Sequence, residues 1–103
     1  MEGNHFDKDK IELHYILELP LIDEMAKVGT FGTKKYGRYN YRKGISYMRI
    51  LGSCTRHLTA FIRGENNDKE SGLSHLAHLA YDAAMLFDII RLHPDCDDRP
   101  RGC

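Results

Sequence analysis

The sequence predicts an all-α fold, a small helical bundle made by one domain of 103 residues. Long segments carry apolar residues at helical spacing, and several begin or end with a recognisable helix signal. A chain of this length buries about two thirds of the surface that its unfolded form exposes. We expect residues 1–9 to be a flexible N-terminus, residues 10–92 to be the helical core, and residues 93–103 to be a flexible tail rich in Asp, Arg and Pro.

The N-terminal part of the core predicts two elements. Apolar and polar side chains alternate at a period of two over residues 10–17, which predicts a short extended segment. A first helix is predicted to begin near Pro20, because proline is favoured in the first turn, and to continue through Val28. Gly29 and Gly32 weaken the helix prediction beyond that residue.

Residues 46–63 predict a second helix, with a serine at its N-cap and a glycine directly after it as a stop signal. Its apolar side suits a core. On the opposite side Arg49, Arg56 and Arg63 recur every seven residues, so they line up as a narrow cationic strip. Such a strip is either a solvated face or a phosphate-binding surface, since arginine suits bidentate phosphate contacts.

A third helix, predicted from about residue 73 to 92, is almost entirely apolar except for three side chains. His75, His78 and Asp82 fall within about 60° of one another at about 100° per residue, so they form one stripe. Burying such groups without partners costs about 1–3 kcal/mol each. The stripe therefore predicts either structural hydrogen bonds to a neighbouring helix or a use in metal binding or catalysis.

Composition excludes several classes of protein. The net charge is zero, with 15 basic and 15 acidic residues, which argues against nonspecific binding to nucleic acid. The three cysteines contain no Cys-x-x-Cys pair, so neither a disulfide framework nor a typical zinc module is expected. No apolar run reaches about 18 residues and no signal-peptide pattern is present, so we expect a soluble cytoplasmic protein without a membrane partner.

Two sets of side chains suggest attack on a phosphoanhydride. Oxygen and imidazole donors would hold a divalent ion, and cations would hold phosphates. The donors are Glu24, Glu65, Asp68, Glu70, His75, His78 and Asp82, and the cations are Lys34, Lys35, Arg42, Lys43, Arg49 and Arg56. Because the chain has no Gly-x-x-x-x-Gly-Lys-Ser/Thr loop and no nucleophile elbow, the expected nucleophile is a metal-activated water.

Short sequence blocks, in their order and spacing, point to a known family. They are Gly32-Thr33-Lys34-Lys35-Tyr36-Gly37, Asn40-Tyr41-Arg42-Lys43-Gly44, Arg56-His57-Leu58-Thr59-Ala60-Phe61, Gly64-Glu65 through Asp68, Glu70-Ser71-Gly72 and His75-Leu76-Ala77-His78. Over roughly residues 8–92 the chain resembles the phage-type dATP/dGTP diphosphohydrolases. These are small relatives of the all-α nucleoside triphosphate pyrophosphohydrolases, which include the MazG and dUTPase-like groups.

The resemblance implies hydrolysis of a purine deoxynucleoside triphosphate, dGTP or dATP, to the monophosphate and pyrophosphate. It also implies Mg²⁺ or Mn²⁺, a role in phage nucleotide-pool metabolism, and a homodimer or homotetramer in the host bacterial cytoplasm. The larger superfamily carries Glu-x-x-Glu on one helix and Glu-x-x-Asp on the next. This chain departs from that pattern, because no carboxylates lie near Ser53 and Arg56, and the second motif reads His75-Leu-Ala-His78.

We therefore expect a composite site. The predicted catalytic residues are Glu70, His75, His78 and Asp82; the predicted metal ligands are Glu24, Glu65, Asp68, Glu70, His78 and Asp82; and the predicted substrate-binding residues are Lys34, Lys35, Tyr36, Asn40, Arg42, Arg56 and His57. Two alternatives stay open. One is an HD-type nucleotide phosphohydrolase, although the chain has no adjacent His-Asp pair, and the other is a non-enzymatic helical binding protein.

Overall fold

The computed structural model describes residues 10–101, so the predicted flexible N-terminus lies outside the described residues. Its elements are α1 (His14–Leu17), α2 (Pro20–Tyr36), η2 (Asn40–Lys43), α3 (Tyr47–Ile62), α4 (His75–Leu92) and η3 (Pro94–Cys96). No strand occurs between residues 10 and 101, which confirms the predicted all-α fold. Within the same range, no helix combines the length and the apolarity needed to cross a bilayer.

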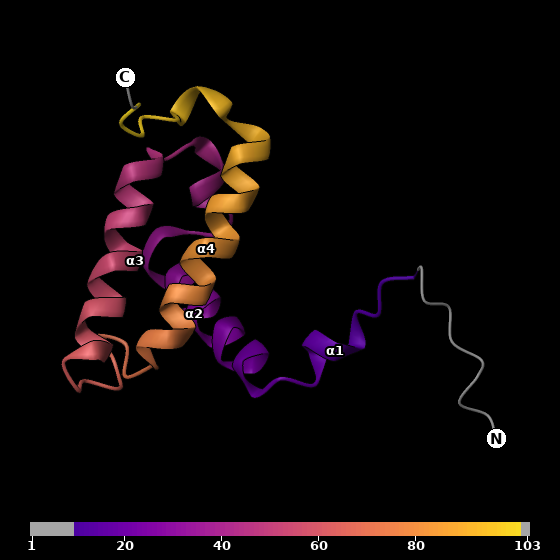
Figure 1. The fold of residues 1–103 in the computed structure, drawn as a ribbon, viewed down its shortest axis with the longest axis vertical. Coiled ribbons are helices and arrows are strands. Elements are labelled where there is room, and N and C mark those ends of the chain that lie inside the picture. Colours follow the sequence, from indigo (N-terminus) through magenta and orange to yellow (C-terminus); the bar gives the residue numbers. More distant parts are fainter. Residues whose placement is uncertain (1–9, 102–103) are drawn as a thin grey trace.

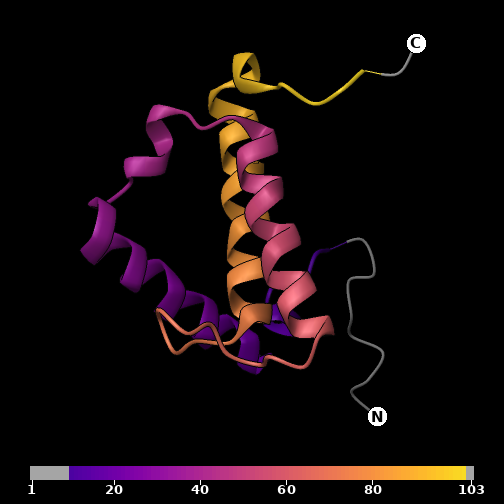
Figure 2. The ribbon, with the colours of Figure 1, turned by 90° about the vertical axis from the view of Figure 1, so that its left-hand side faces the viewer.

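Of the three long helices, α4 is the central one, because both α2 and α3 pack against it. α3 and α4 lie side by side and antiparallel, and this is the most extensive contact between elements (Figure 1). α2 also contacts α4 but inclines away from it, so that its C-terminal end diverges from the α3–α4 pair (Figure 2). The loop between α3 and α4 runs past α2 at the end where these helices come together.

The hydrophobic core lies toward the opposite end of the α3–α4 pair. Its buried members are Tyr47 and Ile50 from α3 and Ile89 from α4. Partly buried side chains surround them, namely Tyr41, Ile45, Cys54, Met85, Leu86 and Cys96. This apolar contact holds the two helices together at one end. The polar side chains at the other end are therefore not part of this core.

The prediction of an extended segment over residues 10–17 is wrong. His14–Leu17 forms a helical turn, with the backbone N–H of Ile16 donating to the Leu13 carbonyl at 3.0 Å and that of Glu18 to the His14 carbonyl at 3.1 Å. A lone extended segment leaves its backbone groups unpaired unless another strand lies beside it. The described chain offers no such strand, whereas a helical turn pairs these groups locally.

The helix that the sequence predicts from Pro20 through Val28 is α2, and it continues to Tyr36. Gly29 lies inside it, where a Cβ atom would come within 3.0 Å of the Tyr81 ring. A glycine at this position therefore permits α2 to approach α4 closely, and this tertiary contact offsets the low helix propensity of glycine.

The predicted flexible tail has more structure than its composition indicates. Pro94–Cys96 forms a short 3₁₀ helix, and Asp98 accepts hydrogen bonds from the Ser46 hydroxyl and from the backbone N–H of Met48 at 2.9 Å. Together these bonds lower the pKa of Asp98, with the Ser46 bond contributing most. A carboxylate beside a helix N-terminus also interacts favourably with the helix dipole. The residues after α4 thus return to the start of α3.

Replacing Ser46 with alanine is expected to lower the free energy of unfolding by about 0.5–2 kcal/mol. Ser46 accepts the Arg49 backbone N–H at 3.3 Å as the N-cap of α3 and also binds Asp98. Thr55 is the matched control, because its exposed hydroxyl bonds within α3 to the Leu51 carbonyl, and Thr55→Ala should change stability by less than about 0.5 kcal/mol. Equal urea-unfolding curves for the two variants would show that this cap is unimportant.

Candidate functional site

Backbone hydrogen bonds hold the loop between α3 and α4 and so place its polar side chains. Gly64 follows α3 with a φ of +99°, a left-handed conformation that favours glycine. Asn67 and Ser74 form an antiparallel bridge, and the backbone N–H of His75 donates to the Asn66 carbonyl at 2.9 Å. Ser74 then caps α4 by accepting a backbone N–H of the first turn. These contacts set the point at which His75 enters α4.

Asp68 organises the middle of this loop. Its backbone N–H donates to the Leu73 carbonyl, and its own carbonyl accepts the Gly72 N–H, both at 2.8 Å. Its side-chain Oδ2 accepts the backbone N–H groups of Glu70 at 3.1 Å and Ser71 at 2.9 Å. Partial burial opposes the charged form, but the hydrogen bonds from Ser71 lower the pKa of Asp68 overall. These hydrogen bonds hold the Asp68 carboxylate inside the turn.

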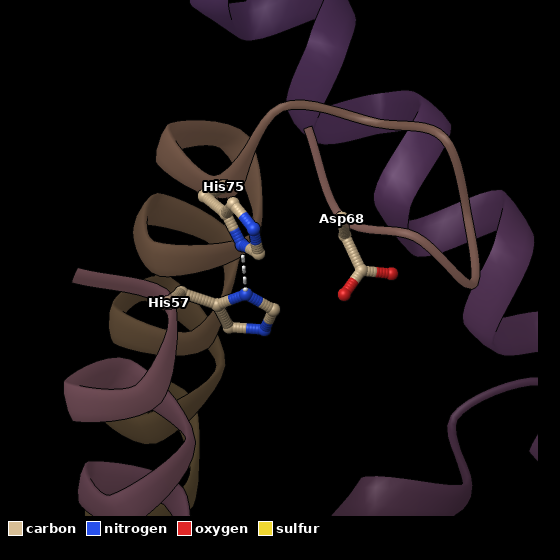
Figure 3. A group of neighbouring side chains, drawn as sticks. All are labelled: His57, Asp68 and His75. Atoms are coloured by element: carbon tan, nitrogen blue, oxygen red, sulfur yellow. Dashed lines mark hydrogen bonds between the residues drawn. The ribbon is translucent and has the colours of Figure 1, made fainter. Parts of the chain in front are cut away.

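Two histidines from different helices face each other beside this loop. His57 on α3 and His75 on α4 approach with their Nδ1 atoms 2.9 Å apart (Figure 3). The Nε2 atom of His75 lies 2.7 Å from Oε2 of Glu65, and only 4% of His75 is exposed. Since an ionised carboxylate only accepts hydrogen bonds, Glu65 favours the His75 tautomer with its proton on Nε2 and a lone pair on Nδ1. A ring nitrogen of each histidine and an oxygen of Asp68 lie within 4.8 Å of one another.

His78 completes the imidazole group from one turn further along α4. Its ring stacks on His57, with centroids 4.5 Å apart and planes inclined by 9°. Its Nε2 atom lies 2.7 Å from the Ser71 hydroxyl, a partner to which the sequence analysis assigned no role. Burial and the neighbouring His78 lower the pKa of His57, which favours a neutral ring with a free lone pair.

Asp82 is the buried carboxylate of the stripe. It is 9% exposed, and its Oδ2 is the buried side-chain atom without a hydrogen-bond partner among residues 10–101. Burial raises its pKa, although a hydrogen bond from Ser53 and the nearby His57, His78 and Arg56 favour the charged form. Ser53 was not among the predicted site residues, although it precedes His57 by one turn of α3 and so shares its face. A buried oxygen left unpaired in this way is suited to receive a further partner.

The structure brings many of the predicted residues into one place, which we call the histidine–carboxylate cluster. It contains His57, Glu65, Asp68, His75, His78 and Asp82. His57 was predicted to bind substrate, but it lies among the donors instead. Glu70 joins the cluster's loop to α2, because its carboxylate pairs with Lys35 Nζ at 2.7 Å. Lys34 lies one residue before Lys35 and lines an open groove between α2 and Leu73 of this loop.

Other predicted residues have different surroundings. Glu24 pairs with Lys27 on α2 at 2.8 Å. Arg42 binds Asp88 at 3.1 Å, toward the end of α4 that is remote from His75, and Tyr41 donates to the same carboxylate at 2.8 Å. Asn40 begins the short helix η2 that carries Arg42. These ion pairs place Glu24 and Arg42 with partners outside the histidine–carboxylate cluster.

The fold and the site define a helical protein with a histidine–carboxylate cluster between two antiparallel helices. This set of donors can hold a divalent ion or transfer protons. Comparison with known proteins places the chain more closely: it belongs to the family described as dATP/dGTP diphosphohydrolase, N-terminal, whose model matches residues 1–99. The resemblance seen in the sequence is thereby confirmed.

A protein of Salmonella phage PMBT28 named dATP/dGTP diphosphohydrolase is similar to this chain, with 33% identity over 99 residues. The similarity covers 96% of the chain and 33% of the phage protein, so the chain spans about a third of the length of that relative. No solved structure matches.

Proposed function

We propose that this chain carries out metal-dependent hydrolysis of a purine deoxynucleoside triphosphate, dGTP or dATP, to the monophosphate and pyrophosphate. The observation that carries this proposal is the histidine–carboxylate cluster, in which a buried oxygen of Asp82 has no partner among the described residues. The family match and the name of the phage relative support this substrate class. A role in phage nucleotide-pool metabolism follows from the same proposal.

The family resemblance implies Mg²⁺ or Mn²⁺, and the imidazole and carboxylate groups of the cluster suit these two ions differently. Mg²⁺ prefers oxygen ligands in near-ideal octahedral geometry and keeps several waters, so paired imidazoles suit it poorly. Mn²⁺ is a first-row transition metal that accepts both nitrogen and oxygen donors. The cluster therefore fits Mn²⁺, with His57, His75 and Asp68 as the residues that would hold it. When bound, such an ion polarises phosphate oxygens and lowers the pKa of a water.

The side chains around the cluster have separate tasks in this proposal. Asp82 accepts a proton from the attacking water, since its Oδ2 is buried, unpaired among residues 10–101 and close to His57. Arg56 lies close enough to Asp82 to lower the pKa of that carboxyl, and its exposed guanidinium suits a phosphate oxygen. Glu65 holds the ring of His75 in place through the 2.7 Å contact.

Substrate binding is assigned to the C-terminal end of α2. Lys34 and Lys35 offer charge to the triphosphate, and Lys35 exchanges Glu70 for a phosphate oxygen when substrate binds. Tyr36 is 62% exposed, with Lys35 Nζ 5.2 Å from its ring centroid, and presents an aromatic face to the base. The homodimer or homotetramer stays a prediction.

The test is to incubate the purified protein with each deoxynucleoside triphosphate and Mn²⁺, and to separate the products. We expect monophosphate and pyrophosphate, fastest with dGTP or dATP, and complete loss of turnover after chelation of the metal. Asp95→Asn provides the control, because Asp95 is 81% exposed and lies outside the cluster. Release of inorganic phosphate or a nucleoside would favour the HD-type alternative. No turnover with any triphosphate would favour the binding protein.

A further inference from the structure

We propose that His57, His75 and Asp68 form a binding site for a first-row transition metal ion and that this site excludes Mg²⁺. The affinity should rise from Mn²⁺ to Co²⁺ and Zn²⁺, as it does for sites with nitrogen ligands in general. This inference rests on the proposed function for the chemistry that the ion supplies, and it adds that the site binds its ion without nucleotide and ranks the ions by affinity. Neither the family pattern of paired carboxylates nor the sequence-based list of metal ligands contains the two histidines as a pair.

The first argument is the distance between the imidazoles. Two nitrogens bound at about 2.1 Å to one ion, and at right angles to each other, would lie about 3 Å apart. The Nδ1 atoms of His57 and His75 are 2.9 Å apart, so adjacent coordination positions match their present separation once the His57 proton has moved from Nδ1 to Nε2. Asp68 reaches in from the loop with an oxygen within 4.8 Å of a nitrogen of each ring, so the three side chains can hold one ion together.

The second argument is that neighbouring residues already orient the ligands. Glu65 binds Nε2 of His75 at 2.7 Å, the carboxylate–histidine arrangement that fixes the tautomer of a metal-binding imidazole. His78 stacks on His57 and so holds its ring plane. Asp68 is held in the loop by the backbone N–H groups of Glu70 and Ser71. These contacts position the ligands, and the hydrogen bond between the two Nδ1 atoms must break when an ion binds.

The third argument comes from comparison with another group of potential ligands in the same chain. His93, Asp95 and Cys96 also lie within reach of one ion. However, Asp95 is 81% exposed, and its carboxylate lies 3.9 Å from Nδ1 of His93. That group lacks a carboxylate fixed by backbone amides, so it provides an internal control for weak, nonspecific binding.

The experiment measures metal binding to the full chain without nucleotide. Titration with Co²⁺, followed by visible absorption and calorimetry, is expected to reach saturation at one ion per chain, and Mg²⁺ should give no competition. His57→Ala should abolish the Co²⁺ spectrum, whereas Glu65→Gln should weaken binding by about 10-fold to 100-fold. Asp95→Asn should bind Co²⁺ as the original protein does. Circular dichroism establishes that each variant is folded, and Glu65→Gln keeps the proposal testable if His57→Ala does not fold.

The results separate this inference from the proposed function. Binding of Co²⁺ that His57→Ala abolishes, in a protein without hydrolase activity, would uphold the metal site and reject the function. Hydrolysis supported by Mg²⁺ in a protein that does not bind Co²⁺ would overturn the metal site alone. The metal site would also be overturned if His57→Ala and Glu65→Gln both bound Co²⁺ as tightly as the original protein does. Loss of Co²⁺ binding in Asp95→Asn would overturn it too. In that case the contact between His57 and His75 is a structural hydrogen bond.

Discussion

If the chain has the proposed activity, Asp82→Asn is expected to reduce kcat for deoxynucleoside triphosphate hydrolysis by about 100-fold or more. A positioned general base typically contributes 10²-fold to 10⁴-fold to a rate, and an amide cannot accept the proton of an attacking water. Asparagine has nearly the same shape as aspartate and can still accept the hydrogen bond from Ser53. Kinetics with saturating dGTP or dATP and Mn²⁺ would measure the loss. Turnover equal to that of the original protein would remove Asp82 from the mechanism.

The same substitution is expected to leave the metal-free fold equally stable or more stable near neutral pH. Burial raises the pKa of Asp82 in the folded protein above its unfolded value. The contribution of such a group to stability is complete below the unfolded pKa and is lost as pH rises through the folded pKa. Near neutral pH the original protein therefore carries the cost of a buried charge, which asparagine lacks. Thermal unfolding would detect this, and a large destabilisation would indicate a structural role for Asp82 instead.

Ile89→Ala is expected to lower the free energy of unfolding by about 2–5 kcal/mol. Ile89 is fully buried and packs with Tyr47 and Ile50, so the substitution leaves a cavity between α3 and α4. Small domains have a total stability of about 5–15 kcal/mol, so this loss would unfold a substantial fraction of the protein on mild heating. It should also weaken the alignment of His57 with His75, since the same two helices carry both rings.

Two control substitutions sharpen this prediction. Ile89→Val removes one methylene group and should cost about 0.5–1.5 kcal/mol. Phe87→Ala removes a larger side chain from the same helix, but Phe87 is 79% exposed, so the isolated chain should lose less than about 0.5 kcal/mol. Urea unfolding of the three variants should thus rank them by burial rather than by size. An equal effect of Phe87→Ala and Ile89→Ala would contradict the packing of the core.

Local signals predicted most of the fold. The N-cap serine of α3 and the glycine after this helix lie where these signals place them, and the ends of α3 and α4 agree with the prediction to within about two residues. Such signals act through the backbone within one turn of a helix, so residues close in sequence contain them. The sequence did not predict the C-terminal end of α2, because helix formation around Gly29 depends on the close approach of Tyr81 from α4.

By itself, the sequence determined the helices, their apolar faces and the stripe of His75, His78 and Asp82 along one of them. Angular position around a helix depends only on spacing, which can be read from the chain. The tertiary structure alone decided which helices meet. It places His57 in contact with His75, and it pairs Arg42 with Asp88. These contacts join residues far apart in sequence, and their formation depends on how apolar faces pack rather than on any local pattern.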